Sequence, residues 1–292
     1  MTNDKLDLAL ASFPAWQCAQ VAGQPTIERK ITQGLSNESY LLRWGNQRFL
    51  LRLFSPGPTH FAGVAAEIEI SQQAHLAGIA PKQIFASLEQ QFVVCDYVDG
   101  FHWNSAQAND PNNVQRLAQV LKKIHLLPSG DRELVLPKVI ENYHQRLQGT
   151  EFESLVQGEW QLQLLATAKE LRASLDHIVL CHNDLVLGNI IDTGDQLYII
   201  DWEYAALCDP MNEIAVIALN HQLGADQIQL LLLSYFGDLN QALRERFESS
   251  YQVASYVDLL WYAAQSVQLG DVTLGNLARS KFETLARIVD SS

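Results

Sequence analysis

Residues 179–205 read "VLCHNDLVLGNIIDTGDQLYIIDWEYA" and place polar side chains at the ends of short apolar runs. Three of these side chains, Asp184, Asn189 and Asp201, lie at the mouths of what the pattern predicts to be buried strands. A carboxylate beside apolar surface costs several kcal/mol unless something pairs with it. These side chains therefore either satisfy one another or hold a cation.

The spacing within this stretch predicts how the side chains are arranged. The turn "TGD" at residues 193–195 indicates a hairpin, which brings Asn189 at the start of one strand beside Asp201 at the end of the other. Paired amide and carboxylate oxygens suit a hard cation such as Mg²⁺, which also keeps several waters. Asp184 lies a few residues upstream of the hairpin and remains available as a base.

The composition excludes one large class of partners. The 292 residues carry 33 acidic and 20 basic side chains, a net charge of −13, without a run of five basic residues. Because nucleic-acid binding relies on clustered Lys and Arg, we expect no nucleic-acid partner. An acidic surface suits cationic small molecules, although solubility alone also accounts for it.

The cysteines and the N-terminus indicate the compartment. The four cysteines are scattered and form no C-x-x-C pair, so neither a zinc site nor a redox motif is supported; they are Cys18, Cys95, Cys181 and Cys208. We expect reduced thiols in a cytoplasmic protein. The N-terminus lacks a basic segment followed by an apolar one, and no apolar run reaches about 18 residues, so we expect no membrane partner.

The chain changes character near Gly100. Before it, strand patterns dominate, with a hairpin of "ESYLLRW" and "RFLLRLF" and one helix over residues 62–77. After it, helical patterns dominate, opening with Asp110 as a helix cap and broken only by strands at 178–181, 189–192 and 196–200. We predict an α+β protein with a small antiparallel β-sheet lobe (residues 1–97) and a larger, mainly helical lobe (residues 98–292).

Two strings of the opening stretch resemble one enzyme family. "HNDLVLGN" has the form H-x-D-x-x-x-x-N, and "IDWEYA" follows about a dozen residues later with an Asp at a strand end. Together they resemble the choline kinase, thiamine kinase and aminoglycoside phosphotransferase family. The resemblance implies a two-lobed, protein-kinase-like fold and the cofactors ATP and Mg²⁺. It also implies a small-molecule hydroxyl as the phosphate acceptor.

The family pattern implies a role for each residue of these strings. Asp184 would accept the proton of the acceptor hydroxyl. Asn189 and Asp201 would hold Mg²⁺ between the phosphates. His182 belongs to the same catalytic loop, as a brace that props up the metal-binding Asp rather than as a proton carrier.

The sheet lobe would bind the nucleotide. Arg52 stands where protein kinases have Lys, and Glu67 is its expected partner, with Glu69 as the alternative. The segment "ITQGLSNESYLL" resembles the family's phosphate loop, and "VVCDYVDG" resembles the hinge whose main chain meets adenine. The residues implied in these two segments are Gly34, Ser36, Asn37, Asp96 and Val98.

The helical lobe would bind the acceptor. The segment "YVDLLWYAAQ", residues 256–265, resembles the choline-kinase helix W-x-x-W-x-x-x-Q, with Trp261 at the second Trp and Asp258 in place of the first. An amphipathic core helix that buries Trp261 is the alternative. Glu203 and Tyr204 are further candidates for the acceptor site. Asp209 and Glu213 could line its mouth, although Asp209 is better explained as a helix cap before Pro210.

The expected function is an ATP-dependent kinase that phosphorylates a hydroxyl of a small, cationic metabolite such as thiamine, choline or a related amino alcohol. An aminoglycoside or sugar kinase of the same fold is the alternative. A non-catalytic, kinase-like nucleotide-binding protein is a third possibility, but such a protein is expected to lack one of Asp184, Asn189 or Asp201. The sequence leaves the oligomeric state open.

Overall fold

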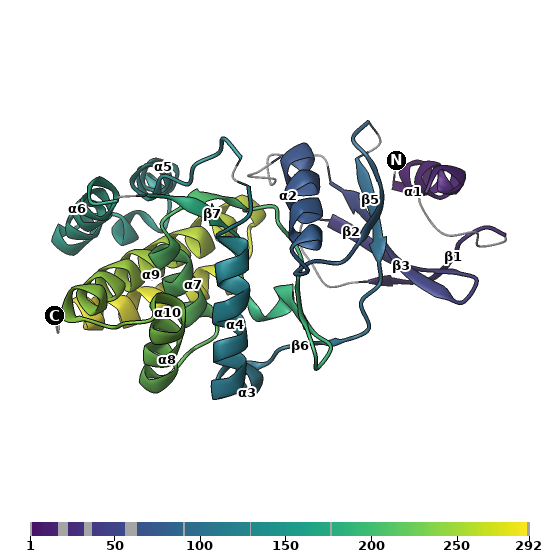
Figure 1. Ribbon diagram of the computed structural model, residues 1–292. Helices are drawn as coiled ribbons and strands as arrows, with labels where there is room; N and C mark the ends of the chain where they lie inside the picture. Colours follow the sequence, from purple (N-terminus) through teal and green to yellow (C-terminus); the bar gives the residue numbers. More distant parts are fainter. Residues whose placement is uncertain are drawn as a thin grey trace.

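The computed structural model describes residues 2–16, 23–31, 37–55, 63–89, 91–128, 130–175 and 177–290. The predicted phosphate-loop residues Gly34 and Ser36, and also Cys18, lie outside the described residues. Figure 1 shows the N-terminus and the main sheet at one end of the molecule and the helical body with the C-terminus at the other.

The N-terminal region is a five-stranded antiparallel sheet of strand order β1-β2-β3-β5-β4. The helix α1 (Thr2–Ala11) precedes this sheet, and α2 (Val64–Leu76) connects β3 to β4. The strands are β1 (Thr26–Ile31), β2 (Asn37–Trp44), β3 (Gln47–Phe54), β4 (Gln83–Ser87) and β5 (Phe92–Asp96). The predicted hairpin is therefore confirmed as β2 and β3, which pair antiparallel along their whole length.

Side chains alternate along β3 between the core and the cleft side of the sheet. Phe49, Leu51 and Leu53 are buried in the sheet core, whereas Leu50 and Arg52 between them are only partly buried. A strand sends successive side chains to opposite faces. The alternation thus fixes Arg52 on the face opposite the hydrophobic core of the sheet.

The rest of the chain is mainly helical, as predicted. The helices are α3 (Ser105–Ala108), α4 (Pro111–Ile124), α5 (Leu136–Leu147), α6 (Glu159–Ala173), α7 (Pro210–Asn220), α8 (Ala225–Phe236), α9 (Gln241–Leu269) and α10 (Val272–Asp290). Asp110 and Asp209 cap α4 and α7 through side-chain bonds to backbone N–H groups, which confirms both predicted caps. In the described residues, no helix combines the length and the apolar character needed to cross a membrane.

Short strands within the helical region carry the candidate site. The strands β8 (Ile190–Asp192) and β9 (Leu197–Ile199) form the predicted hairpin, and β6 (Phe101–His102) pairs with β8. A second small sheet joins β7 (Val179–Cys181) to β10 (Ala206–Cys208). The sequence patterns did not predict β6 or β10.

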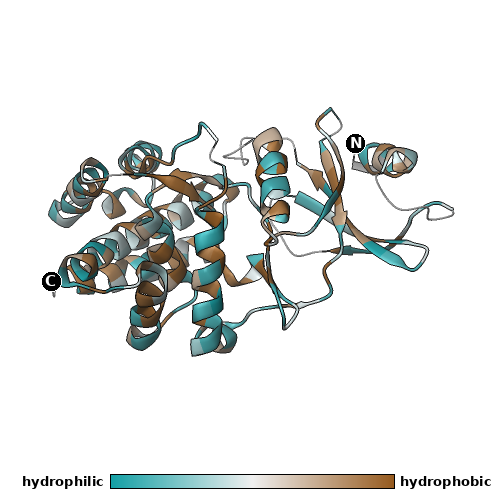
Figure 2. Ribbon diagram, viewed as in Figure 1, coloured by the Kyte–Doolittle hydropathy of each residue, from teal (hydrophilic) through white to brown (hydrophobic). Residues whose placement is uncertain are grey.

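The hydrophobic core consists of three clusters. The sheet has its own cluster around Phe49, while a larger one, which includes Ile70 and Ala74 of α2, packs α4, α7 and α8 around β8 and β9. A third cluster joins α5, α6, α9 and α10. In Figure 2, α4 carries both teal and brown turns, which fits a helix with Leu117 and Leu121 buried on one face. The predicted division between residues 97 and 98 remains a prediction.

Candidate active site

The loop after β7 holds its conformation through His182. This side chain is fully buried; its Nε2 donates to the carbonyl of Ile200 at 3.0 Å, and its Nδ1 accepts the N–H of Asp184 at 3.3 Å. The ring also lies against Trp202, with centroids 4.7 Å apart. Burial lowers the pKa of His182, so the ring is neutral. These contacts agree with the expected brace between the loop and the strand end that carries Asp201.

Asp184 and Asn189 are joined directly. The Nδ2 group of Asn189 donates to the Asp184 carbonyl at 2.8 Å and to its Oδ2 at 3.1 Å. Burial and, to a smaller extent, the nearby charges of Asp201 and Glu203 together raise the pKa of Asp184 to about 7. The role of Asp184 as the base that takes a proton from the acceptor hydroxyl remains a prediction.

Asp201 follows β9 in a left-handed backbone conformation, with φ 68°. Its Oδ1 accepts from Nη2 of Arg52 at 2.7 Å, and Nη1 of the same guanidinium lies 2.9 Å from Oε1 of Glu67. The expected Arg52–Glu67 pair is thus present, and the alternative partner Glu69 is not needed. Arg52 links the sheet, α2 and the end of β9 across the two regions.

The donor set suits a divalent cation. The hairpin brings Asn189 beside the end of β9, since the N–H of Ile200 donates to the Asn189 carbonyl at 3.1 Å. With Nδ2 engaged by Asp184, Oδ1 is the atom of Asn189 that can ligate a cation. The negative charges of Asp201 and Glu203 both disfavour a negative charge on Asp184. A bound Mg²⁺ would reduce this repulsion. The assignment of Asn189 and Asp201 as Mg²⁺ ligands remains a prediction.

A pocket opens beside this site, between the sheet, α2 and the end of β9. Arg52, Glu67 and Asp201 line it together with apolar and small side chains from β5 and α2. Asp96 ends β5, and its N–H donates to the Lys82 carbonyl at 2.8 Å; Val98 follows two residues later. The adenine contacts of Asp96 and Val98 remain predictions.

Asn37 is the one residue of the predicted phosphate loop within the described part of the chain. It begins β2, and its Oδ1 accepts the N–H of Ser55 at 3.1 Å. The side chain therefore fastens the start of β2 to the end of β3. A phosphate contact of Asn37 remains a prediction.

Two acceptor candidates from different elements meet near Asp184. The indole N–H of Trp261 donates to the hydroxyl of Tyr204, and Glu203 and Asp184 both act electrostatically on that hydroxyl. Burial is the main cause that raises the pKa of Tyr204, so the phenol stays neutral. Trp261 is only partly buried, which disfavours the alternative of a core tryptophan.

Asp258 has a cationic partner within the chain. Its carboxylate forms an ion pair with Nζ of Lys281 on α10 at 2.6 Å. Binding a cationic acceptor would require Asp258 to exchange Lys281 for that acceptor. Its role as a substrate residue remains a prediction that these contacts do not support.

The expectation that Glu213 lines the site mouth is wrong. Glu213 is fully buried, with Oε2 2.6 Å from Nε2 of His125 and Oε1 accepting the N–H of Asn183 at 2.9 Å. It lies one turn after the Asp209 cap, on the inward face of α7. A role for Asn183 was not predicted, because its only signal in the sequence is its place between His182 and Asp184.

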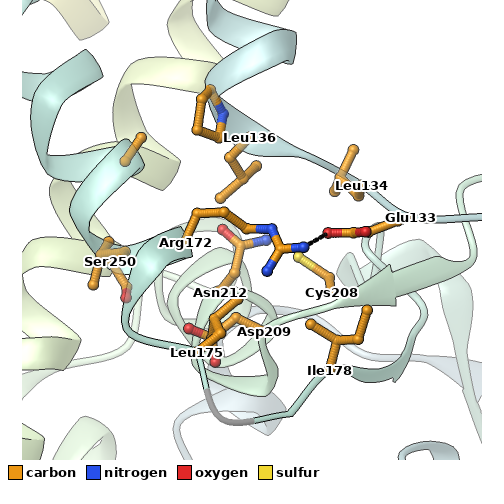
Figure 3. Close-up of a pocket in the computed structure, with 13 residues that line it drawn as sticks. Glu133, Leu134, Leu136, Arg172, Leu175, Ile178, Cys208, Asp209, Asn212 and Ser250 are labelled. Carbon is orange, nitrogen blue, oxygen red and sulfur yellow. Dashed lines mark ion pairs between the residues drawn. The ribbon is translucent and has the colours of Figure 1, made fainter.

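Figure 3 shows a different pocket, close to Cys208 at the C-terminal end of β10. Arg172 of α6 reaches across it to Glu133, with Nη2 2.6 Å from Oε1. Of the candidate site residues that the structure describes, only Asp209 lines this pocket, and its side chain caps α7.

Comparisons with known proteins show which proteins the chain is similar to. The model of the phosphotransferase enzyme family, APH, matches residues 28–248. The protein LicA of Haemophilus influenzae is 25% identical over 226 residues, which cover 75% of this chain and 66% of that protein. A thiamine kinase of Escherichia coli is 29% identical over 203 residues, which cover 69% of this chain and 68% of that protein. The chain thus spans about two thirds of the length of both relatives.

Solved structures show the same fold. The choline kinase LicA of Streptococcus pneumoniae superposes with a TM-score of 0.73 at 19% identity, covering 97% of this chain and 98% of that chain. A spectinomycin phosphotransferase superposes with a TM-score of 0.62 at 14% identity, covering 96% and 93%. The expected two-lobed, protein-kinase-like α+β fold is therefore confirmed.

Proposed function

Because the chain belongs to the phosphotransferase enzyme family, we propose that it transfers the γ-phosphate of ATP to a hydroxyl of a small cationic metabolite, such as thiamine, choline or a related amino alcohol. The coarser assignment follows from the family and its relatives: the chain is a small-molecule kinase. The observation that carries the finer proposal is the pocket lined by Asp201 and the Arg52–Glu67 pair. Next to it, Asn189 is bonded to Asp184 and lies beside the end of β9.

Each of these residues has a separate role in the proposed phosphoryl transfer. Asp184 accepts the proton of the acceptor hydroxyl and orients it for attack. Arg52, held by Glu67, binds phosphate oxygens through its planar guanidinium. Mg²⁺ held by Asn189 and Asp201 would neutralise phosphate charge. Catalysis then rests on positioning and on charge stabilisation rather than on covalent chemistry.

The residues proposed to bind the phosphate acceptor favour a cationic molecule. Glu203 is buried near Asp184, and both act electrostatically on the Tyr204 hydroxyl, which is bonded to Trp261. A quaternary ammonium or a thiazolium ring is attracted to aromatic faces and to a nearby carboxylate. The relatives include a thiamine kinase and, among solved structures, a choline kinase.

A substrate panel tests the proposal. Purified protein is incubated with ATP, Mg²⁺ and one acceptor at a time, and ADP release is measured. Thiamine, choline and ethanolamine represent cationic alcohols, and aminoglycosides represent the alternative. We expect turnover with at least one cationic alcohol and none after chelation of Mg²⁺. Turnover only with aminoglycosides or sugars, or no turnover of any cationic alcohol, would contradict the proposal.

The variant Asp184→Asn distinguishes a catalytic from a binding role. It keeps the size of the side chain but removes the base, so turnover should fall by at least about 10²-fold while ATP binding persists. ATP binding is measured separately by calorimetry. Retained activity would show that another group takes the proton. ATP binding by the wild type without turnover of any acceptor would favour a non-catalytic, nucleotide-binding protein.

A further inference from the structure

Asn183 connects two segments that carry the candidate site. Its Nδ2 group lies 3.3 Å from the carbonyl of Cys181, 3.1 Å from that of Tyr204 and 3.3 Å from that of Ala206. Its two amide hydrogens are thus shared among the loop before Asp184 and the segment after Asp201. The β7–β10 pairing ends at Cys181 and Ala206, and this side chain extends the connection beyond it to the Tyr204 carbonyl.

The backbone of Asn183 is fixed from the other side. Its φ of 63° is a left-handed conformation that Asn, Asp and Gly tolerate better than other residues. Its N–H donates to Oε1 of the fully buried Glu213, whose Oε2 lies 2.6 Å from Nε2 of His125. Nδ1 of His125 lies 2.6 Å from the hydroxyl of Tyr235. This chain of bonds anchors Asn183 to the helical core.

A histidine, a cysteine and a glutamate lie close together behind the loop, and hydrogen bonds between them explain this grouping. The ligand-type atoms of His125, Cys181 and Glu213 lie within 4.8 Å of one another. The 2.6 Å separation of Nε2 and Oε2 is that of a charge-assisted hydrogen bond, and Sγ of Cys181 lies 3.7 Å from Nε2. The group therefore serves to anchor the loop and provides no case for a metal centre.

We propose that Asn183 is a positioning residue that sets the acceptor-binding segment, residues 203–206, relative to Asp184. Asp184 is its neighbour in the chain, and the Tyr204 carbonyl is one of its acceptors. Loss of the Nδ2 bonds frees Glu203 and Tyr204 to shift away from the base. Acceptor binding then weakens, whereas the nucleotide side, held by Arg52, is unchanged. The kinetic part of this inference rests on the proposed function.

The variant Asn183→Gly separates the side chain from the backbone. Glycine keeps the N–H bond to Glu213 and adopts positive φ without strain, so only the Nδ2 bonds are lost. Aspartate in Asn183→Asp also adopts positive φ. It places a carboxylate oxygen, which cannot donate, against the three carbonyls. If Asn183 served only the left-handed turn, glycine would be neutral or better.

Hydrogen–deuterium exchange tests the proposal independently of turnover. In Asn183→Gly, amide exchange across residues 203–207 should rise about tenfold, including the Ala205 N–H that donates to Trp202. Exchange in α4 and α9 should stay unchanged. Gln222→Gly is a matched control, because Gln222 is an exposed residue with φ 53° outside the site. Unchanged exchange at 203–207, or an equal rise throughout the chain, would overturn the proposal.

Kinetics with an acceptor from the substrate panel provide the second measurement. In Asn183→Gly, KM for the acceptor should rise about tenfold while KM for ATP stays within about twofold, and Asn183→Asp should be worse than glycine. A glycine variant with wild-type KM for the acceptor would overturn the proposal. If the wild type turns over no cationic alcohol, the proposed function fails, and the exchange result alone decides whether Asn183 holds the segment.

Discussion

Replacing Asp192 by asparagine should lower the free energy of unfolding by about 2 kcal/mol at neutral pH. Asp192 ends β8 and is almost fully buried. Its two oxygens accept from both terminal nitrogens of Arg116, at 2.7 and 2.8 Å, and also from Nε1 of Trp103 and the N–H of Gly194. These bonds attach α4 to the hairpin that carries the candidate metal ligands.

The magnitude follows from the titration of the Asp192 carboxyl. Hydrogen bonding to Arg116 is the main cause that lowers its pKa from 3.8 to about 2, against the opposing effect of burial. A pKa difference of one corresponds to 1.36 kcal/mol, so this group contributes about 2 kcal/mol. Because the folded pKa lies below the unfolded one, the contribution is complete above about pH 4 and is lost as the pH falls toward 2.

Urea unfolding followed by tryptophan fluorescence and circular dichroism measures this difference. Between about pH 5 and pH 8 the difference in free energy of unfolding between wild type and Asp192→Asn should be constant. The reason is that the pKa of Asp192 lies below this range in both the folded and the unfolded state. Asp195→Asn, an equal charge change on the same turn at an exposed residue, is the control and should cost less than about 0.5 kcal/mol. A gap below about 0.5 kcal/mol for Asp192→Asn would refute the reasoning, as would one that grows between pH 5 and pH 8.

Three further substitutions test other contacts. Arg52→Gln removes the cation paired with Glu67, so KM for ATP should rise at least about tenfold in initial-rate assays; an unchanged KM would exclude a phosphate contact. Asp209→Ala removes the cap on Met211 N–H and the ion pair with Arg246, so urea unfolding should show a loss of about 1–2 kcal/mol, and a neutral result would contradict the cap. Trp261→Ala should raise KM for a cationic acceptor at least about fivefold with little change in KM for ATP, and equal effects on both would place Trp261 outside the acceptor site.

The sequence by itself determined the elements that carry the chemistry. The turn at residues 193–195 and the flanking apolar runs predicted the hairpin that brings Asn189 beside the end of β9. The strand "RFLLRLF" was predicted from its pattern, and the family resemblance supplied Arg52 within it and Glu67 as its partner. These predictions depend on local periodicity and on motif spacing, both of which can be read along the chain.

Only the tertiary structure decided which distant groups hold the site in place. Asn183 reaches the Tyr204 carbonyl 21 residues away, Glu213 bonds a residue 30 positions upstream, and Arg116 lies 76 residues before Asp192. Periodicity shows which face of a helix turns inward, but it does not show which buried polar groups meet there. That pairing follows from how the helices pack around the short strands, because each buried polar group must find a partner within the folded core.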